Sequence, residues 1–234
     1  MELLVVQHDP ISPPGAIGQR FEDHGYNVTL HEIVGYDNFE TPNVVPDLPS
    51  FTQYDAILTM GARWSAYDHD TVGNWVVPEI AALREADAAG VPVLGICFGG
   101  QLLAAAHGGS VIASPAPELG WVDISTTDEA TVPQGPWFQW HGDKWVIPPT
   151  ATQIAENPSA SQAFALRRNL AVQFHPELDR AMLQGWLDNG GEEYATNIGV
   201  DLGALLSETQ DREAEARTRA QALVDGFIAN VAKR

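Results

Sequence analysis

The sequence predicts an α/β fold with a mainly parallel sheet that is flanked by helices on both sides. Between residues 3 and 106, short apolar runs typical of buried strands alternate with amphipathic helical segments. A strand, a helix and a second strand in succession form a right-handed crossover, which makes the two strands parallel and lays helices over the sheet. A glycine-flanked turn at residue 97 also joins the strand at 91–96 directly to a helix.

The elements of this first half follow from periodicity and from turn residues. In chain order we expect a strand at 3–7, a helix that carries Ile17 and Phe21 and ends at Gly25, a strand at 28–30, a loop at 35–50, a strand at 56–60, a helix at 77–89 and a strand at 91–96. The prolines at 42, 46 and 49 favour the long loop. The carboxyl ends of such strands gather reactive groups at one edge of the sheet.

The second half of the sequence shows a different pattern, with short predicted strands separated by Pro and Gly turns. Short strands are expected at 121–125, 137–140 and 145–147, as a small antiparallel extension of the sheet, and a last strand at 170–174. Beyond it the chain becomes helical, with breaks near 189–191 and 199–203. Ser207 and Gln210 form a capping box that predicts the start of the last helix, whose apolar stripe is expected to pack on the core or, in part, to meet a partner.

Composition limits the class of protein. Asp and Glu number 31 against 12 Lys and Arg, a formal net charge of −19, so binding to nucleic acid or to an anionic membrane is not expected. The single cysteine excludes an internal disulfide and a multi-cysteine metal site, which suits a reducing, cytoplasmic location. We expect residues 1–234 to form one domain, with 178–234 as a C-terminal helical extension packed on it.

The turn at residue 97 is the first candidate for chemistry. Gly95 and Gly99 flank Cys97, with one residue between on each side, so the backbone can form a tight turn that side chains would obstruct. The thiol then lies at the start of a helix, where the positive end of the dipole stabilises negative charge on sulfur. A buried structural cysteine is the alternative, and the glycines favour a nucleophile.

A cysteine nucleophile needs a base and an orienting acceptor, which His175 and Glu177 offer at the end of the last strand. Residues two apart in an extended segment point the same way, so the two side chains can lie together. The amide of Phe98 is the expected first donor to an oxyanion. The amide of Gly61 is the expected second, because Gly61 should lie near Cys97, although a simple turn is the default interpretation of a glycine after a strand.

These residues resemble the triad type of the class I glutamine amidotransferases. The resemblance covers about residues 1–185 and rests on Gly95-Ile96-Cys97-Phe98-Gly99-Gly100-Gln101, on Val172-Gln173-Phe174-His175-Pro176-Glu177 and on the loop that Gly61 opens. With Trp140-His141-Gly142-Asp143, the chain is similar to stand-alone members related to the glutaminase domain of GMP synthetase and to plant γ-glutamyl peptidases. The resemblance implies a flavodoxin-like sheet and a γ-glutamyl thioester on Cys97.

The resemblance also implies substrate contacts, without any metal or cofactor. Gln101 matches a glutamine that contacts substrate, and His141 and Asp143 match a segment beside the pocket, although they are also typical of an ordinary turn. The loop departs from the family's usual Gly-Gly-Pro, because Ala62 and Arg63 follow Gly61. The bulk of this loop is expected to influence which substrate fits.

Two enzymatic interpretations stay open. An amidotransferase or glutaminase would release ammonia from glutamine. Because the sequence contains no phosphate-binding Gly-x4-Gly-Lys-Ser/Thr loop with which to activate an acceptor, a separate synthase subunit would receive this ammonia. A γ-glutamyl peptidase would instead use water as the final acceptor. A non-catalytic regulatory protein or a redox sensor on the same fold is the third class, and neither requires Cys97, His175 and Glu177 together.

Overall fold

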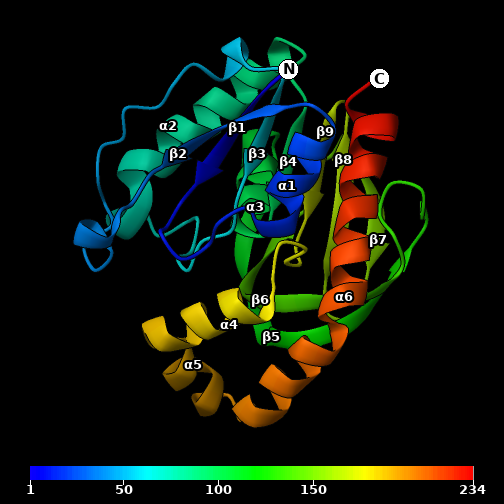
Figure 1. Ribbon diagram of the computed structural model, residues 1–234. Helices are drawn as coiled ribbons and strands as arrows, with labels where there is room; N and C mark the ends of the chain where they lie inside the picture. The colour runs from blue at the N-terminus through cyan, green and yellow to red at the C-terminus, as the bar shows by residue number, and fades with distance from the viewer. Residues whose placement is uncertain (234) are drawn as a thin grey trace.

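The computed structural model describes residues 1–233, which form a mixed sheet of nine strands (Figure 1). The strands are β1 (Glu2–Gln7), β2 (Asn27–Glu32), β3 (Ala56–Thr59), β4 (Val93–Ile96), β5 (Ser110–Thr126), β6 (Gly135–Val146), β7 (Thr152–Glu156), β8 (Ser161–Leu166) and β9 (Asn169–Val172). Their order across the sheet is β2-β1-β3-β4-β9-β8-β7-β5-β6.

The parallel half of the sheet confirms the predicted fold class. The pairs β1–β2, β1–β3, β3–β4 and β4–β9 are all parallel. Every residue of β3, β4 and β9 is buried, as their short apolar runs predict for strands covered on both faces. Since these strands run the same way, the loops that follow β1, β3, β4 and β9 meet at one edge of the sheet.

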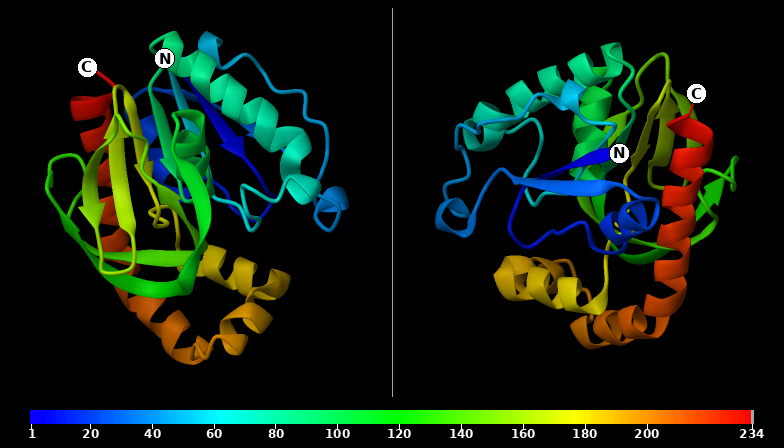
Figure 2. Two further views of the ribbon diagram at one scale, coloured as in Figure 1. Left: turned by 180° about the vertical axis from the view of Figure 1, so that it is seen from behind. Right: turned by 45° about the horizontal axis from the view of Figure 1, so that its top comes forward.

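Helices cover both faces of the sheet, as expected (Figure 2). The helices are α1 (Gly15–Asp23), α2 (His69–Ala88), α3 (Phe98–Ala106), α4 (Arg180–Trp186), α5 (Glu192–Asn197) and α6 (Leu202–Gly226), which a wider turn over Phe227–Val231 continues. One apolar cluster joins α1 and α6 to alternate residues of β1, such as Leu3 and Val5. A second cluster joins α2 and α3 to the opposite face, through Leu4 and Val6.

The antiparallel half is more extensive than the sequence indicated. The three short strands expected at 121–125, 137–140 and 145–147 are parts of two long strands, because β5 and β6 pair as a hairpin with one irregularity between Ala113 and Glu118. The hairpin between β7 and β8 was not predicted. Its strands extend the sheet from β9 by antiparallel pairing, and they are short segments in which tertiary pairing outweighs weak local propensity.

Two predicted helix starts are wrong. The helix expected at 77–89 begins at His69, because burial of Val72, Trp75 and Val76 outweighs the interruption that Pro78 signals. The last helix begins at Leu202 instead of near Ser207. Its N-cap is Asp201, whose carboxylate accepts the Ala204 amide at 3.0 Å, so the capping-box interpretation fails.

The C-terminal segment wraps the edge of the sheet where the parallel strands end. Helices α4 and α5 lie below this edge, and α6 returns along the sheet so that both termini lie at the opposite end (Figure 1). The predicted apolar stripe of α6 packs on the core, with Leu223, Val224 and Phe227 fully buried. None of the helices in residues 1–233 combines the length and apolar character that a bilayer crossing requires.

Candidate active site

Cys97 forms a strained turn between β4 and α3. Its φ of 48° and ψ of −105° lie in a region that non-glycine residues rarely adopt, and its amide donates to the Val172 carbonyl at 2.7 Å. The flanking glycines provide room for this turn: a Cβ on Gly95 would stand 2.8 Å from the Gly99 carbonyl oxygen, and one on Gly99 would stand 2.2 Å from that of Thr59. The backbone strain therefore lies at Cys97 itself, and the two glycines let neighbouring backbone segments approach the turn closely.

The structure brings His175 and Glu177 together just after β9. The His175 Nδ1 lies 2.8 Å from the Glu177 Oε1, and both side chains are buried. Burial by itself lowers the pKa of His175, but the charge of Glu177 and the charge and hydrogen bond of Cys97 raise that pKa well above its ordinary value. The imidazole is thus paired with the carboxylate and lies beside the thiol.

The other face of His175 is covered by an aromatic ring from α4. The centroids of the His175 and Trp186 rings are 4.8 Å apart in an edge-on arrangement. Trp186 is itself held by a hydrogen bond from its indole nitrogen to the Ile11 carbonyl at 3.0 Å. A residue of the C-terminal segment therefore limits the movement of the imidazole.

Gly61 and Phe98, the two expected oxyanion donors, flank the thiol. A Cβ on Gly61 would stand 2.9 Å from His175 Cε1 and 3.8 Å from Cys97 Cβ. Phe98 is the first residue of α3, where backbone amides have no partner inside the helix. The structure thus places both residues beside Cys97.

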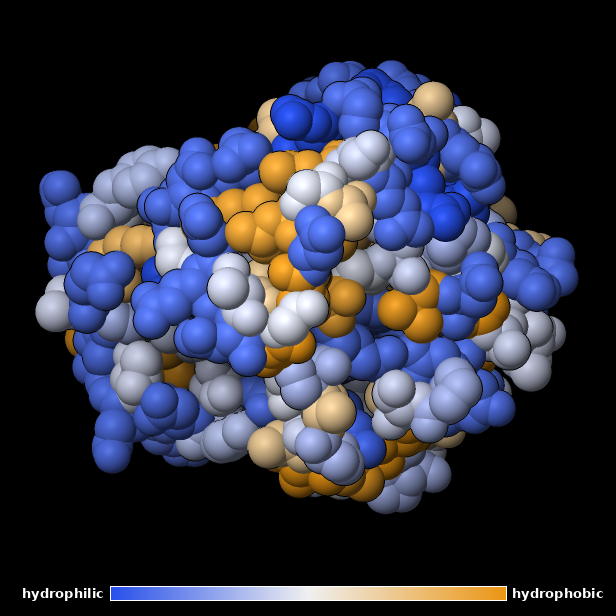
Figure 3. Space-filling model, turned by 90° about the horizontal axis from the view of Figure 1, so that it is seen from below, coloured by the Kyte–Doolittle hydropathy of each residue, from blue (hydrophilic) through white to orange (hydrophobic). Residues whose placement is uncertain are grey.

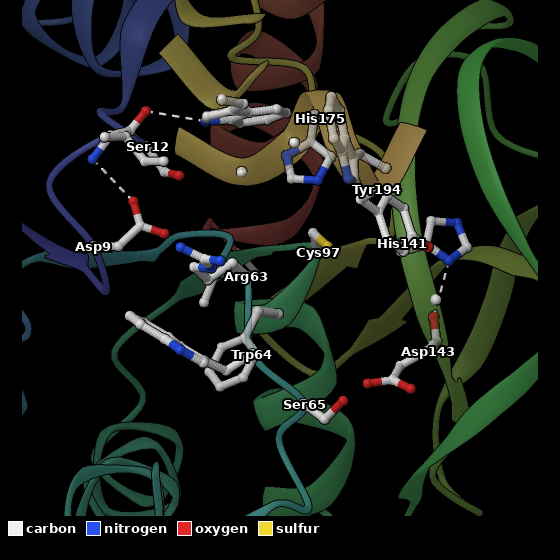
Figure 4. A pocket seen from close by; sticks show the side chains of 18 of the residues that line it. Asp9, Ser12, Arg63, Trp64, Ser65, Cys97, His141, Asp143, His175 and Tyr194 are labelled. Atoms are coloured by element: carbon white, nitrogen blue, oxygen red, sulfur yellow. Dashed lines mark hydrogen bonds between the residues drawn. The ribbon is translucent and has the colours of Figure 1, made fainter. Parts of the chain in front are cut away.

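The thiol opens into a cavity of about 360 Å³ (Figure 4). The lining residues are Asp9, Ile11, Ser12, Ala62, Arg63, Trp64, Ser65, Cys97, Phe98, Gln101, Trp140, His141, Gly142, Asp143, His175, Trp186, Asn189, Gly190, Gly191 and Tyr194. The volume falls in the range of pockets that bind small molecules. On the face seen from below, hydrophobic residues gather along the middle with hydrophilic residues around them (Figure 3).

The three residues expected to contact substrate all line this cavity. His141 Nδ1 donates to the Asp143 carbonyl at 2.9 Å, and the Gln101 side-chain amide approaches the same carbonyl at 3.4 Å. The Asp143 carboxylate accepts the hydroxyl of Tyr67 at 2.9 Å. A further amide, from Gln173, lies 3.5 Å from the sulfur of Cys97. His141 and Asp143 lie to the right of Cys97 in Figure 4.

Several lining residues were not predicted from the sequence. Asp9 and Ser12 follow β1, so the rule that strand ends gather functional groups could have found them. Burial raises the pKa of Asp9, which faces the cavity near Arg63. Trp186 and Tyr194 carry no local signal, and the helical extension was expected to pack on the core or, in part, to meet a partner, not to line a cavity. Among residues 1–233, no cluster of His, Cys, Asp and Glu has the arrangement of a metal site.

Comparison with known proteins matches the chain to one family. The family model described as "Glutamine amidotransferase class-I" matches residues 19–185. One subunit of the glutamine-hydrolyzing GMP synthase of Sulfolobus acidocaldarius is 28% identical over 164 residues, which cover 65% of this chain and 84% of that protein. The glutamine-hydrolyzing GMP synthase of Aliivibrio fischeri is 38% identical over 152 residues, or 59% of this chain and 28% of the relative.

Solved structures resemble the whole chain. A glutamine amidotransferase from Methylobacillus flagellatus superposes with a TM-score of 0.85 at 25% identity, covering 98% of this chain and 95% of the other. A glutamine amidotransferase from Thermotoga maritima has a TM-score of 0.83 at 21% identity and covers 98% and 99% of the two chains, which shows a shared fold. With the family model spanning most of its length, this chain belongs to the class I glutamine amidotransferase family.

Proposed function

We propose that this protein hydrolyses the γ-amide of glutamine through a thioester on Cys97. The observation that carries the proposal is the position of a strained, helix-capping cysteine beside a buried histidine that pairs with a carboxylate at 2.8 Å. This is the arrangement that nucleophilic acyl transfer requires. Family membership supports the same substrate.

In the first half of the reaction, the sulfur of Cys97 attacks the γ-carbonyl carbon. The amides of Gly61 and Phe98 hold the oxyanion that forms. His175, kept protonated by Glu177, donates a proton to the departing nitrogen, so that the carbon–nitrogen bond breaks and ammonia leaves. A γ-glutamyl thioester remains on the sulfur.

In the second half, the neutral His175 removes a proton from water. The hydroxide equivalent attacks the thioester carbonyl, the same amides hold the second oxyanion, and the carbon–sulfur bond breaks. Glutamate is released, and the proton on His175 restores its pairing with the sulfur of Cys97. One glutamine and one water thus yield one glutamate and one ammonia.

The cavity suggests where the glutamyl group binds. Gln101 and Asp143 present polar atoms on one side of Cys97, and we assign them to the α-amino and α-carboxylate groups of the substrate. These contacts would orient the γ-carbonyl toward the sulfur, which is where a bound geometry lowers the barrier most. We assign His141 to holding this wall of the cavity, because its Nδ1 bonds the Asp143 carbonyl and its Nε2 lies 3.1 Å from Gln139 Oε1.

The relatives support a proposal for the fate of the ammonia. The S. acidocaldarius relative is, by its name, one subunit of a GMP synthase, and we propose that this chain similarly supplies ammonia to a separate synthase subunit.

We also propose that residues 1–234 form one domain with 178–234 as its helical extension, since α6 shares an apolar cluster with α1 and β1. A single calorimetric transition with equal calorimetric and van't Hoff enthalpies would test this organisation.

A second candidate function is hydrolysis of γ-glutamyl peptides. The observation that favours it is the aromatic wall that Trp64, Trp140, Trp186 and Tyr194 form along the cavity, since such rings can stack on a larger leaving amine. The chemistry at Cys97 would be unchanged, with an amine in place of ammonia.

One experiment tests both candidates. The purified protein and a Cys97→Ser variant are incubated with glutamine and with γ-glutamyl dipeptides, and released ammonia, amine and glutamate are measured. We expect turnover of glutamine by the wild type and none by the variant, with a γ-glutamyl adduct on the quenched wild type by mass spectrometry. Turnover of peptides alone selects the second candidate, and no release from any substrate rejects both.

A further inference from the structure

A buried, charged cluster lies directly beneath the Gly61 loop and has no part in the chemistry described above. His8, in the turn after β1, and Glu79, on α2, are both completely inaccessible to solvent. The His8 Nε2 lies 2.9 Å from a Glu79 oxygen, and the hydroxyl of Thr59 donates to the other oxygen at 2.8 Å. Removing such groups from water is unfavourable, so their retention at this place calls for a role.

The cluster reaches the oxyanion loop through the second nitrogen of His8. The His8 Nδ1 lies 3.3 Å from the carbonyl oxygen of Gly61, and a carbonyl can only accept, so this nitrogen carries a proton. Burial by itself lowers the pKa of His8, but Glu79 raises it and the net shift is upward. Glu79, with a smaller contribution from Asp9, therefore keeps a hydrogen bond donor aimed at Gly61.

Gly61 needs external support because of two opposing demands. It must be glycine, since a Cβ there would stand 2.9 Å from His175 Cε1. Glycine, however, is the residue with the greatest backbone freedom. A donor amide for an oxyanion is effective only when its direction is set before the reaction.

Both peptide groups that flank Gly61 are held by hydrogen bonds. The Met60 carbonyl accepts the amide of Gly99, in the first turn of α3, at 2.9 Å, and the Gly61 carbonyl accepts from His8. In a trans peptide the carbonyl and the amide of the next residue point in opposite directions, so fixing the Met60 carbonyl fixes the Gly61 amide. Fixing the second carbonyl completes the backbone conformation of Gly61.

His8 is also in contact with the other donor residue. Its ring packs edge-on against Phe98, with centroids 5.0 Å apart, and is stacked on Trp75 at 5.3 Å. The same imidazole therefore touches the residue on each side of the oxyanion site.

We propose that His8, held by Glu79 and Thr59, is a positioning residue that sets the Gly61 peptide for oxyanion stabilisation. The inference deepens the proposed function and rests on it. His8 does not touch the substrate; its effect passes through the Gly61 carbonyl. Its loss should reduce transition-state stabilisation while leaving the nucleophile and ground-state binding in place.

The test compares two variants of His8, one without a hydrogen bond donor and one with an amide donor. His8→Phe keeps an aromatic ring without a donor, whereas His8→Asn places an amide N–H near the former Nδ1. Each is combined with Glu79→Gln so that no buried carboxylate is left without a partner, and Glu79→Gln alone is the reference. Asn169→Ala is the control for a purely structural defect, because buried Asn169 binds Asp87 and Val93 at the opposite edge of the sheet.

The expected result separates chemistry from stability. Misplacing an oxyanion donor lowers kcat by roughly 30- to 100-fold in the Phe double variant, with KM changed less than about threefold. The Asn double variant should recover to within about fivefold of Glu79→Gln, because a neutral donor again reaches Gly61. Alkylation of Cys97 by iodoacetamide needs no oxyanion site, so its rate should stay within about twofold in all variants. Asn169→Ala should lower Tm and leave kcat unchanged.

Three outcomes would overturn the proposal: kcat in the Phe double variant within twofold of the reference, equal losses for Phe and Asn, or alkylation falling in parallel with kcat. A second measurement is independent of turnover. In ¹⁵N-labelled protein, the Gly61 amide should exchange with solvent faster in the Phe double variant than in the reference, and an unchanged rate rejects the positioning role. If the wild type hydrolyses no γ-glutamyl compound, the proposed function fails and the exchange measurement still decides this inference.

Discussion

Substitution of Gly61 by alanine tests the geometry of the site at its tightest point. The added methyl group would stand 2.9 Å from His175 Cε1 and 3.8 Å from Cys97 Cβ. The imidazole cannot easily retreat, because Glu177 holds its Nδ1 at 2.8 Å and the ring of Trp186 packs against it. Either the loop or His175 must therefore move.

The size of this movement follows from the contact distance. An ordinary van der Waals contact begins near 3.4 Å, so the methyl group and the ring must separate by about 0.5 Å. Since a displacement of about 1 Å can reduce a rate by about 100-fold, we expect kcat to fall by about 10- to 100-fold. Overpacking should also lower the free energy of unfolding by about 1–3 kcal/mol.

The assay is release of glutamate from glutamine at saturating substrate, together with urea unfolding of the same preparations. Gly185→Ala is the matched control, because a Cβ at Gly185, within α4, meets nothing within 4 Å. The control should keep its kcat and gain about 0.5–1 kcal/mol of stability from helix propensity. If Gly61→Ala retains kcat within about twofold, the placement of Gly61 beside the reacting atoms is refuted.

Three further predictions concern the acid–base pair and the elbow. Glu177→Gln should lower kcat by about 10²–10⁴-fold, because the imidazole of His175 loses both its orienting acceptor and its stabilising charge. Pre-steady-state release of ammonia measures this loss, and a loss below about threefold contradicts the role of Glu177 in orienting His175. The wild-type kcat should fall as pH rises through the raised pKa of His175. The stability that this raised pKa contributes is complete below the ordinary pKa of imidazole and should be lost as pH rises through the raised pKa. Profiles of kcat and Tm against pH test both, and a fall in kcat at the same pH in Glu177→Gln argues against His175 as the proton donor. Gly99→Ala should destabilise the fold by at least about 3 kcal/mol, since its Cβ would stand 2.2 Å from the Thr59 carbonyl oxygen; an unchanged urea midpoint would show that the elbow has room to relax.

Local sequence patterns predicted the parallel half of the fold well. Buried strands with continuous apolar runs, such as 93–96 and 56–59, need no distant information to be recognised. The hairpin of β7 and β8 was missed because its strands owe their existence to pairing with β9 and with each other. The start of α6 was misplaced because Ser207 and Gln210 match a capping pattern that the Asp201 cap, earlier in the chain, supersedes.

The catalytic candidates were also accessible from local motifs. The glycines around Cys97 indicate a tight turn, and the spacing of His175 and Glu177 indicates two side chains on one face. Both features depend on only a few consecutive residues, so a local motif is enough to predict them. Chain order alone does not report contacts between distant segments. For that reason the sequence did not indicate that the C-terminal segment covers the site.

The sequence by itself determined the fold class and the turn at Cys97 and named the candidate residues for acyl transfer, because each depends on short-range sterics, periodicity or chemical type. Only the tertiary structure decided what surrounds them. Trp186, the last residue of α4, packs on the imidazole from just beyond the residues that the family model matches. His8 and Glu79 meet beneath Gly61 across 71 residues of chain. Packing of this kind depends on which side chains meet when distant elements assemble, which no local pattern specifies.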